Sequence, residues 1–211
     1  MRITIVYDNT AKAGLIPDWG WSCFVETEER NILFDTGGNG RILMKNLKNL
    51  SIKPESVNDV VISHPDFDHI GGLSAFLNSN EKADVYIPSS FRGIRYPNAV
   101  HYCDEPQEIY HGVYLTGELG KREQSMAVNT ERGLVLVIGC GHPGVESIMN
   151  SVSPFGEIYG VVGGLHDFNN FDILENTGII CPAHCTKYKE QIMQLYADKC
   201  VEGGVGRVIE I

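Results

Sequence analysis

The sequence of 211 residues contains no apolar run long enough to span a membrane, so no transmembrane helix is expected. Its first residues alternate like a β-strand and lack the apolar region and cleavage pattern of a signal peptide. The six cysteines form no CxxC pair. We therefore expect a cytoplasmic protein whose cysteines are free thiols, because disulfides are rare in reducing compartments.

Basic residues are also scarce, since 17 Lys and Arg stand against 27 Asp and Glu and the formal net charge is −10. No basic cluster stands out along the chain. Nucleic acid is not an expected partner, because its phosphate backbone is bound mainly by Lys and Arg. No membrane partner is expected either. A small anionic substrate would need local help from a metal ion, because the overall field of the protein does not attract it.

No internal repeat, linker or low-complexity tract interrupts the chain. With 43% hydrophobic residues, its 211 residues are enough to bury a core. We therefore predict a single domain over residues 1–211. Apolar patterns predict strands over 2–7, 134–138 and 205–211, helices over 145–152 and about 187–199, and little regular structure over 89–112.

The densest chemical signal packs two histidines and two aspartates into six residues, His64-Pro65-Asp66-Phe67-Asp68-His69. The apolar run 60–62 precedes it and predicts a buried strand. His64 and Asp66 are two residues apart, so in an extended chain their side chains leave on the same side. Asp68 and His69 are adjacent, and a turn can direct them to a second point nearby. Imidazole and carboxylate groups together suit zinc, manganese or iron.

A polar turn is the simpler interpretation, because Asp and Gly are common in turns and Asp66 or Asp68 could cap the next helix. Four potential ligands in six residues are dense for one turn, so we favour a metal site. Other apolar strands also end in polar turns, which contain Asp35, Cys140 to His142, His166 and His184. Strands of one sheet can end at a common edge, where such distant side chains can converge.

These motifs resemble the metallo-β-lactamase superfamily, whose HxHxDH signature is similar to the stretch from His64 to His69. Asp35 matches the buried aspartate that supports the ligand loop in that family. Residues 139–144, 163–166 and 183–186 resemble more narrowly the dihydropterin-methyl-ribofuranosylaminobenzene phosphate synthase-like branch. The resemblance covers nearly the whole chain. It implies an α/β (α+β) fold, the four-layer αββα metallo-β-lactamase sandwich.

The resemblance also implies a dinuclear site that binds one or two divalent metal ions. His64 and Asp66 would bind one ion, and Asp68 and His69 a second. His184 matches the last histidine of the family and would join the second site.

The remaining ligands are less clear from the resemblance. Cys140 occupies the place of the family's bridging carboxylate, and His142, two residues on, is our first candidate to replace it. Glu118 and His166 are further candidates, for which a supporting or capping role is an equal alternative.

The main departure from the family is Asp66, where a histidine is usual. A carboxylate is a harder ligand than imidazole and adds negative charge, which favours manganese or iron over zinc. The alternative is that one metal site is weak or empty and that Asp66 acts as a base.

We therefore predict a metal-dependent hydrolase or phosphate-releasing enzyme that uses metal-activated water. Asp68 would orient the nucleophile or move its proton. The substrate would be a phosphorylated pterin-like molecule or another phosphoester. The alternative is a non-catalytic metal- or ligand-binding sensor on the same fold, which the Asp66 and Cys140 departures favour. An iron-dependent redox protein is disfavoured, because nothing in the sequence resembles a flavin domain.

Overall fold

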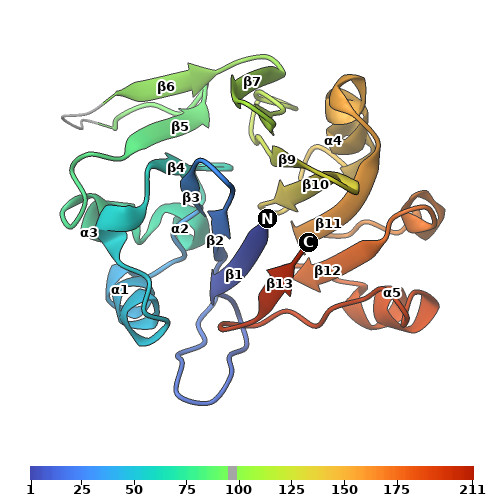
Figure 1. The fold of residues 1–211 in the computed structure, drawn as a ribbon, viewed down its shortest axis with the longest axis horizontal. Helices are drawn as coiled ribbons and strands as arrows, with labels where there is room; N and C mark the ends of the chain where they lie inside the picture. Colours follow the sequence, from blue (N-terminus) through green and yellow to red (C-terminus); the bar gives the residue numbers. More distant parts are fainter. Residues whose placement is uncertain (95–98) are drawn as a thin grey trace. The chain divides into compact units, whose positions relative to one another are not determined.

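The computed structural model describes residues 1–94 and 99–211, and it divides into two compact units (Figure 1). Unit 1 comprises Met1–Tyr102 and Gly203–Ile211, and unit 2 comprises Cys103–Glu202. Each unit is a β-sheet with helices packed against it. The expectation of a single domain over residues 1–211 stays a prediction.

Unit 1 contains a seven-stranded sheet in the order β13-β1-β2-β3-β4-β5-β6. Its strands are β1 (Arg2–Tyr7), β2 (Ser22–Glu26), β3 (Asn31–Phe34), β4 (Asp59–Val61), β5 (Asp84–Pro88), β6 (Val100–Cys103) and β13 (Val208–Glu210). β1 runs antiparallel to β13 and β2, and β2 antiparallel to β3. β3, β4 and β5 are parallel, so their carboxyl ends meet at one edge of the sheet.

The helices of unit 1 bury their apolar sides against this sheet. They are α1 (Gly40–Asn49), the 3₁₀ turn η1 (Pro54–Ser56), α2 (Phe67–Ile70) and α3 (Leu73–Leu77). The side chain of Asn39 accepts hydrogen bonds from the first backbone amides of α1, which caps that helix. Leu43 and Leu47 of α1 and Phe76 of α3 belong to one buried cluster with Val60 of β4. The i, i+4 spacing of the two leucines places both on the face that packs.

Unit 2 contains a six-stranded sheet in the order β12-β11-β10-β9-β8-β7. Its strands are β7 (Gln107–Tyr110), β8 (Val113–Leu115), β9 (Met126–Thr130), β10 (Gly133–Ile138), β11 (Ile158–Gly164) and β12 (Ile179–Ala183). β7 to β10 form an antiparallel series, whereas β10, β11 and β12 are parallel. The residues of β10 from Leu134 to Ile138 are all buried. This explains why that strand is a continuous apolar run rather than an alternating one.

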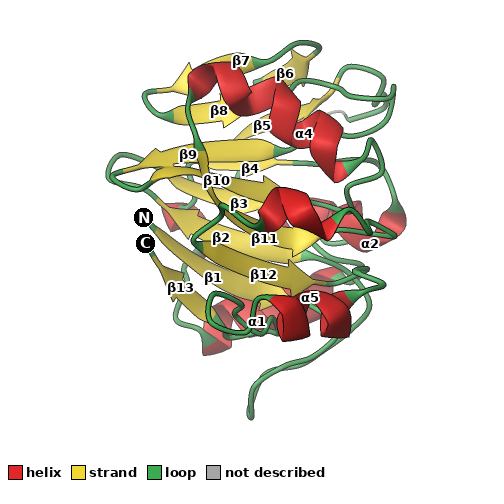
Figure 2. Ribbon diagram, turned by 90° about the vertical axis from the view of Figure 1, so that its right-hand side faces the viewer, coloured by secondary structure: helices red, strands yellow, loops and turns green. Residues whose placement is uncertain are grey.

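The helices of unit 2 lie on one face of its sheet (Figure 2). They are α4 (Val145–Val152) and α5 (Lys189–Leu195), with the 3₁₀ turns η2 (Ser153–Phe155) and η3 (Phe171–Leu174). Ile148 of α4 and Ile192 of α5 pack in one buried cluster with Leu136 of β10 and Ile180 of β12. The core of this unit therefore lies between its helices and its parallel strands.

Two predictions about secondary structure were wrong. Residues 89–112 contain the strands β6 and β7. Residues 95–98 of this range lie outside the described part of the chain. These two strands end their sheets and are only partly buried, so they lack the apolar alternation that marks a strand. The helix expected over about 187–199 is limited to α5, because the backbone leaves helical geometry at Tyr196, with φ of −125°. The strand over 2–7 and the helix over 145–152 have the predicted bounds.

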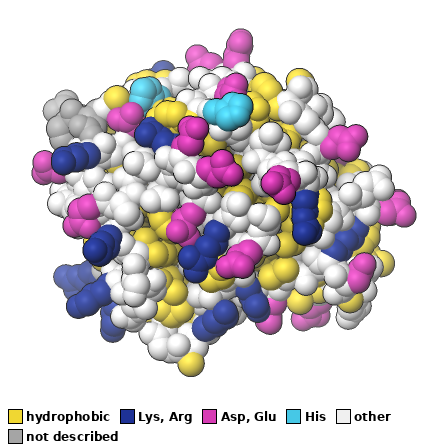
Figure 3. Space-filling view, viewed as in Figure 1, with side chains coloured by type: hydrophobic (Ala, Val, Ile, Leu, Met, Phe, Trp, Pro, Cys, Tyr) yellow, Lys and Arg dark blue, Asp and Glu magenta, His cyan; other side chains and the backbone are white. Residues whose placement is uncertain are grey.

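Charged side chains of both signs are interspersed on the face shown in Figure 3. Within residues 1–94 and 99–211, no helix has the length and apolar character needed to cross a bilayer.

Candidate metal centre

The predicted ligand stretch of unit 1 lies where β4 ends and the chain turns into α2. His64 follows the strand, Asp66 is the N-cap residue of α2, and Asp68 and His69 lie within the helix. His64 and His69 are fully buried, and the centroids of their rings lie 4.1 Å apart. The short helix therefore brings both predicted pairs of side chains together in one place.

Asp35 supports this stretch from the neighbouring strand. Because β3 and β4 are parallel, the residue that follows β3 lies beside the loop that follows β4. One carboxylate oxygen of Asp35 accepts a hydrogen bond from the Ser63 backbone amide at 2.7 Å. The other lies 2.7 Å from both the Ser63 hydroxyl and Nδ1 of His69. Burial raises the pKa of the Asp35 carboxyl, whereas the charge and hydrogen bond of His69 and the bonds from Ser63 oppose that rise. With Nδ1 of His69 engaged, Nε2 is the ring atom that can bind an ion.

The distances between the four side chains fit shared metal ligation. Nε2 of His64 lies 3.4 Å from a carboxylate oxygen of Asp66, and Nε2 of His69 lies 4.0 Å from one of Asp68. Two ligands that are each about 2.1 Å from a tetrahedral ion lie about 3.4 Å apart. The first pair has this spacing and the second approaches it. Nitrogen and oxygen donors in this mixture fit zinc, manganese or iron.

Unit 2 carries its predicted residues at the carboxyl ends of three parallel strands. Cys140 and His142 follow β10, His166 follows β11, and His184 follows β12. A potential ligand atom of Cys140 lies within 4.8 Å of one in His142 and of one in His184. The centroids of the His142 and His166 rings lie 5.0 Å apart. The common edge predicted from sequence therefore exists within unit 2, and Cys140 lies among the histidines.

Three of these strand-end residues have backbone angles that a non-glycine residue rarely adopts. Asp35 has φ of 55°, and His166 and His184 both have φ of 45°. Such positions cost about 1 kcal/mol or more and persist where the surrounding structure enforces them. Here each one turns the chain sharply at the carboxyl end of a strand. Strained positions of this kind cluster at functional sites, which supports the candidate residues at the strand ends of each unit.

Glu123 is a candidate functional residue that sequence reasoning did not identify. It lies in the loop between β8 and β9, and its side chain is fully buried. Its carboxylate accepts hydrogen bonds from the backbone amides of Cys140, Gly141 and His142 at 2.9, 2.9 and 3.0 Å, and lies 2.8 Å from Nδ1 of His142. In sequence it stands in the charged segment 121–124, which looks like an exposed loop. No local pattern reveals its partners, because they are 17 to 19 residues away.

The two further candidates differ in exposure. The His166 side chain is 47% exposed, and its Nδ1 lies 3.3 Å from a carboxylate oxygen of Asp167. Glu118 is half-buried in the same loop as Glu123. Whether either residue binds a metal stays a prediction.

The two tryptophans of unit 1 have different environments. Trp21 is fully buried, and its backbone amide donates to the carbonyl oxygen of Asp68 at 3.1 Å. Trp19 is 52% exposed, and Phe67, between the two aspartates of the ligand stretch, is 68% exposed. A Cβ atom at Gly38 would lie 3.0 Å from the Trp19 carbonyl oxygen and 3.5 Å from the Phe67 ring. The Trp19 loop therefore packs beside the ligand stretch and adds an exposed aromatic surface there.

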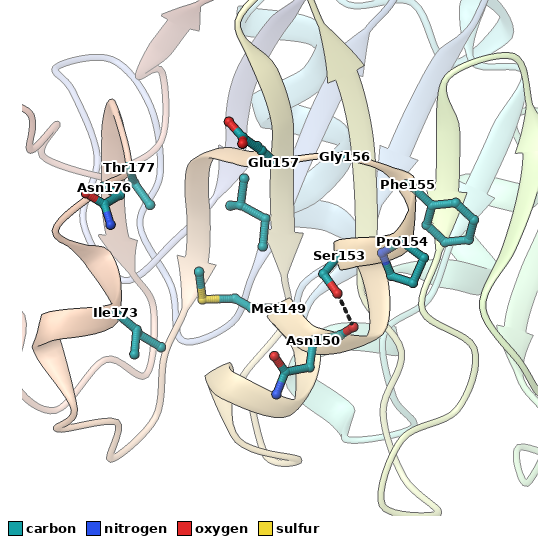
Figure 4. Close-up of a pocket in the computed structure, with 11 residues that line it drawn as sticks. Met149, Asn150, Ser153, Pro154, Phe155, Gly156, Glu157, Ile173, Asn176 and Thr177 are labelled. Atoms are coloured by element: carbon teal, nitrogen blue, oxygen red, sulfur yellow. Dashed lines mark hydrogen bonds between the residues drawn. The ribbon is translucent and has the colours of Figure 1, made fainter.

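A hollow of about 770 Å³ lies elsewhere in unit 2, beside α4, η2 and η3 (Figure 4). Ile158, which lines it, is the first residue of β11, whereas His166 follows the other end of that strand. This hollow is therefore separate from the candidate ligands of unit 2. It is lined by Met149, Asn150, Ser153, Pro154, Phe155, Gly156, Glu157, Ile158, Ile173, Asn176 and Thr177.

Comparison with known proteins identifies the family. Residues 17–144 match the family model of the metallo-beta-lactamase superfamily. This range contains the ligand stretch from His64 to His69, Cys140 and His142. The chain belongs to the metallo-β-lactamase superfamily. It is 24% identical over 249 residues to the 7,8-dihydropterin-6-methyl-4-(beta-D-ribofuranosyl)-aminobenzene-5'-phosphate synthase of Methanocaldococcus jannaschii, covering 84% of this chain and 85% of that protein.

Several solved structures share the fold of this chain. Tm1679, described as a metal-dependent hydrolase of the beta-lactamase superfamily, has a TM-score of 0.79 and 24% identity, covering 100% of this chain and 99% of that one. Zn²⁺-bound PqqB from Methylobacterium extorquens has a TM-score of 0.69 and 12% identity, with both chains fully covered at 100%. These likenesses and the two large sheets confirm the predicted fold class.

Proposed function

We propose that this chain is a metal-dependent hydrolase. The proposed ligands are His64, Asp66, Asp68, His69, His142 and His184. The observation that carries the proposal is the environment of His69 in unit 1. Its ring is fully buried, its Nδ1 lies 2.7 Å from the Asp35 carboxylate, and its Nε2 is directed to the side of Asp68. A histidine held in this way through one nitrogen is prepared to bind a metal with the other.

When bound, a divalent ion would supply the nucleophile, because it lowers the pKa of water so that hydroxide forms near neutral pH. The residues of the chain would do the rest. Asp68 lies at the start of α2 with its carboxylate beside His69, which would let it orient the attacking water and take up its proton. Burial of His64 and His69 excludes solvent from their ligand atoms, which strengthens their interactions with charge.

We further propose that the substrate is a small anionic phosphoester, with a pterin-like molecule as the first choice. The similarity to the Methanocaldococcus jannaschii synthase supports this choice, since the name of that protein contains both a pterin and a phosphate. The exposed rings of Trp19 and Phe67 beside the ligand stretch also support it, because aromatic side chains can stack on a planar heterocycle. A cytoplasmic location belongs to the same proposal and is supported by the six free cysteines.

Metal content and turnover test this proposal together. We expect purified protein to contain one or two divalent ions per chain and to hydrolyse a bis-phosphodiester probe. Chelation should abolish turnover, and added zinc or manganese should restore it. His64→Ala and His184→Ala should each lower metal content, whereas His111→Ala should not, because that side chain is 93% exposed beside Glu108. Protein that neither contains metal nor gains activity when metal is added would contradict the proposal.

A non-catalytic sensor is the second candidate, and the position of Asp66 favours it. Its side chain is 41% exposed and stands where the family usually has a histidine, so one metal site would be weak. Protein that retains no tightly bound metal after gentle purification and turns over no phosphoester would support the sensor over the hydrolase.

A further inference from the structure

We propose that Glu123 is a positioning residue for metal binding, which fixes the ring of His142 in the tautomer whose Nε2 atom faces the ion. This inference rests on the proposed function, because it takes His142 to be a metal ligand. It adds a residue outside the ligand motifs and assigns it a specific task. In this assignment Glu123 acts through His142 and is not itself a ligand.

The hydrogen bonds of the Glu123 carboxylate determine the tautomer. Oε1 accepts from the backbone amides of Cys140 and Gly141, both at 2.9 Å. Oε2 accepts from the backbone amide of His142 at 3.0 Å and faces Nδ1 of the same residue at 2.8 Å. An ionised carboxylate can only accept hydrogen bonds. Nδ1 must therefore carry the proton, and in the neutral ring the lone pair is then on Nε2.

The loop that holds His142 is built around this carboxylate. Gly141 has φ of 78°, a left-handed conformation that turns three successive amides, from Cys140 to His142, toward one point. Such a run of amides forms a concave binding site for an anion. The Glu123 backbone is fixed in turn, because its carbonyl accepts from the Leu119 amide at 2.8 Å and its amide donates to the Leu119 carbonyl at 3.2 Å. Loop and carboxylate therefore hold each other in place.

Unit 1 contains the same arrangement built from different elements. Asp35 is also fully buried, and its carboxylate accepts from the Ser63 backbone amide and faces Nδ1 of His69 at 2.7 Å. Asp35 comes from the end of a neighbouring parallel strand, whereas Glu123 comes from a loop between antiparallel strands. Two separate loops thus pair a buried carboxylate with Nδ1 of a candidate ligand. Carboxylates in this position orient the histidine ligands of metal sites.

A purely structural role would need only the three backbone amides, so the bond to Nδ1 is what the experiment must address. The direct test is a two-bond ¹H–¹⁵N correlation spectrum of the metal-free wild-type protein labelled at histidine. We expect His142 to be in the Nδ1–H form. A spectrum in which the Nε2–H form of His142 predominates would overturn the proposal, and this measurement does not depend on any variant being folded.

Zinc affinity, measured by competition with a chromophoric chelator, provides the second test. Glu123→Gln replaces an acceptor oxygen with an amide nitrogen that cannot accept from His142, so we expect zinc affinity to fall by about 10- to 100-fold. The matched control is Glu131→Gln, an exposed glutamate in the turn between β9 and β10, which should leave the affinity unchanged. In a His142→Ala background, Glu123→Gln should have no further effect.

The outcomes separate this inference from the function on which it rests. If the wild-type chain binds neither zinc nor manganese, the proposed function fails. If it binds zinc and Glu123→Gln stays within twofold of wild type, only the role of Glu123 fails. An equal loss of affinity in the wild-type and His142→Ala backgrounds would also overturn the inference, because Glu123 would then act on the loop and not through His142.

Discussion

Nε2 of His64 lies 3.4 Å from a carboxylate oxygen of Asp66. The two residues are separated by one position in the chain, and their side chains point to the same place. If both bind one ion, Asp66→His should raise the ratio of bound zinc to bound manganese, because imidazole is a softer ligand than carboxylate. Elemental analysis after exposure to equal amounts of both metals measures this ratio. Asp66→Asn serves as the control, since it removes the charge without adding an imidazole. An unchanged ratio in Asp66→His would show that Asp66 is not a ligand.

Replacement of Asp35 should affect both stability and metal binding. The Ser63 hydroxyl and Nδ1 of His69 share one carboxylate oxygen of Asp35 in a fully buried site. In Asp35→Asn an amide nitrogen takes the place of that oxygen, so both groups lose their acceptor. We expect the metal-free protein to lose about 1–3 kcal/mol of unfolding free energy in urea, and zinc affinity to fall by about 10- to 100-fold. Ser63→Ala, which removes one hydroxyl and keeps the Asp35–His69 contact, should have the smaller effect on affinity. Equal affinities of Asp35→Asn and wild type would limit Asp35 to holding the loop.

Tyr7 should make stability depend on alkaline pH. Burial raises the pKa of Tyr7, and its hydrogen bond to Asp18 and the charge of Asp18 raise it further. The unfolded chain therefore loses this proton near pH 10 while the folded chain retains it. The stabilisation from Tyr7 is complete below pH 10 and declines above it, by up to about 1.4 kcal/mol per pH unit. Tyr7→Phe should be about 1 kcal/mol less stable at pH 8, with a shallower decline in urea unfolding above pH 10. Parallel curves for both proteins would contradict this assignment.

Gly163 should not tolerate a side chain. Its φ is 125°, and a Cβ atom there would lie 2.0 Å from the carbonyl oxygen of Ile138. That contact lies where β10 and β11 approach each other just before the candidate ligands. We expect Gly163→Ala to lose about 3 kcal/mol or more in chemical unfolding, from backbone strain together with overpacking. Gly14→Ala is the matched control, because Gly14 has φ of 86° and nothing within 4 Å of its Cβ position. Similar losses in both variants would show that strain alone matters.

The sequence pattern was sufficient to predict a structural feature where the residues that form the feature are close together in the chain. The apolar run of β10 and the helix spacing of α4 predicted elements that the structure contains at nearly the same bounds. The spacing of His64 and Asp66 likewise predicted that their side chains would meet. Local pattern was insufficient for β6 and β7, because strands at the end of a sheet bury too little surface to need apolar alternation.

The sequence by itself determined the strands that precede the candidate ligands, because each is an apolar run at a short and regular spacing, and its motifs resemble those of the superfamily that the family model identifies. Only the tertiary structure decided which buried carboxylate supports which histidine. Asp35 contacts a residue 34 positions away and Glu123 one 19 positions away. Those pairings arise when parallel strand ends and a folded loop are brought together by packing. A carboxylate in a charged segment has no local feature that shows whether it will be solvated or buried.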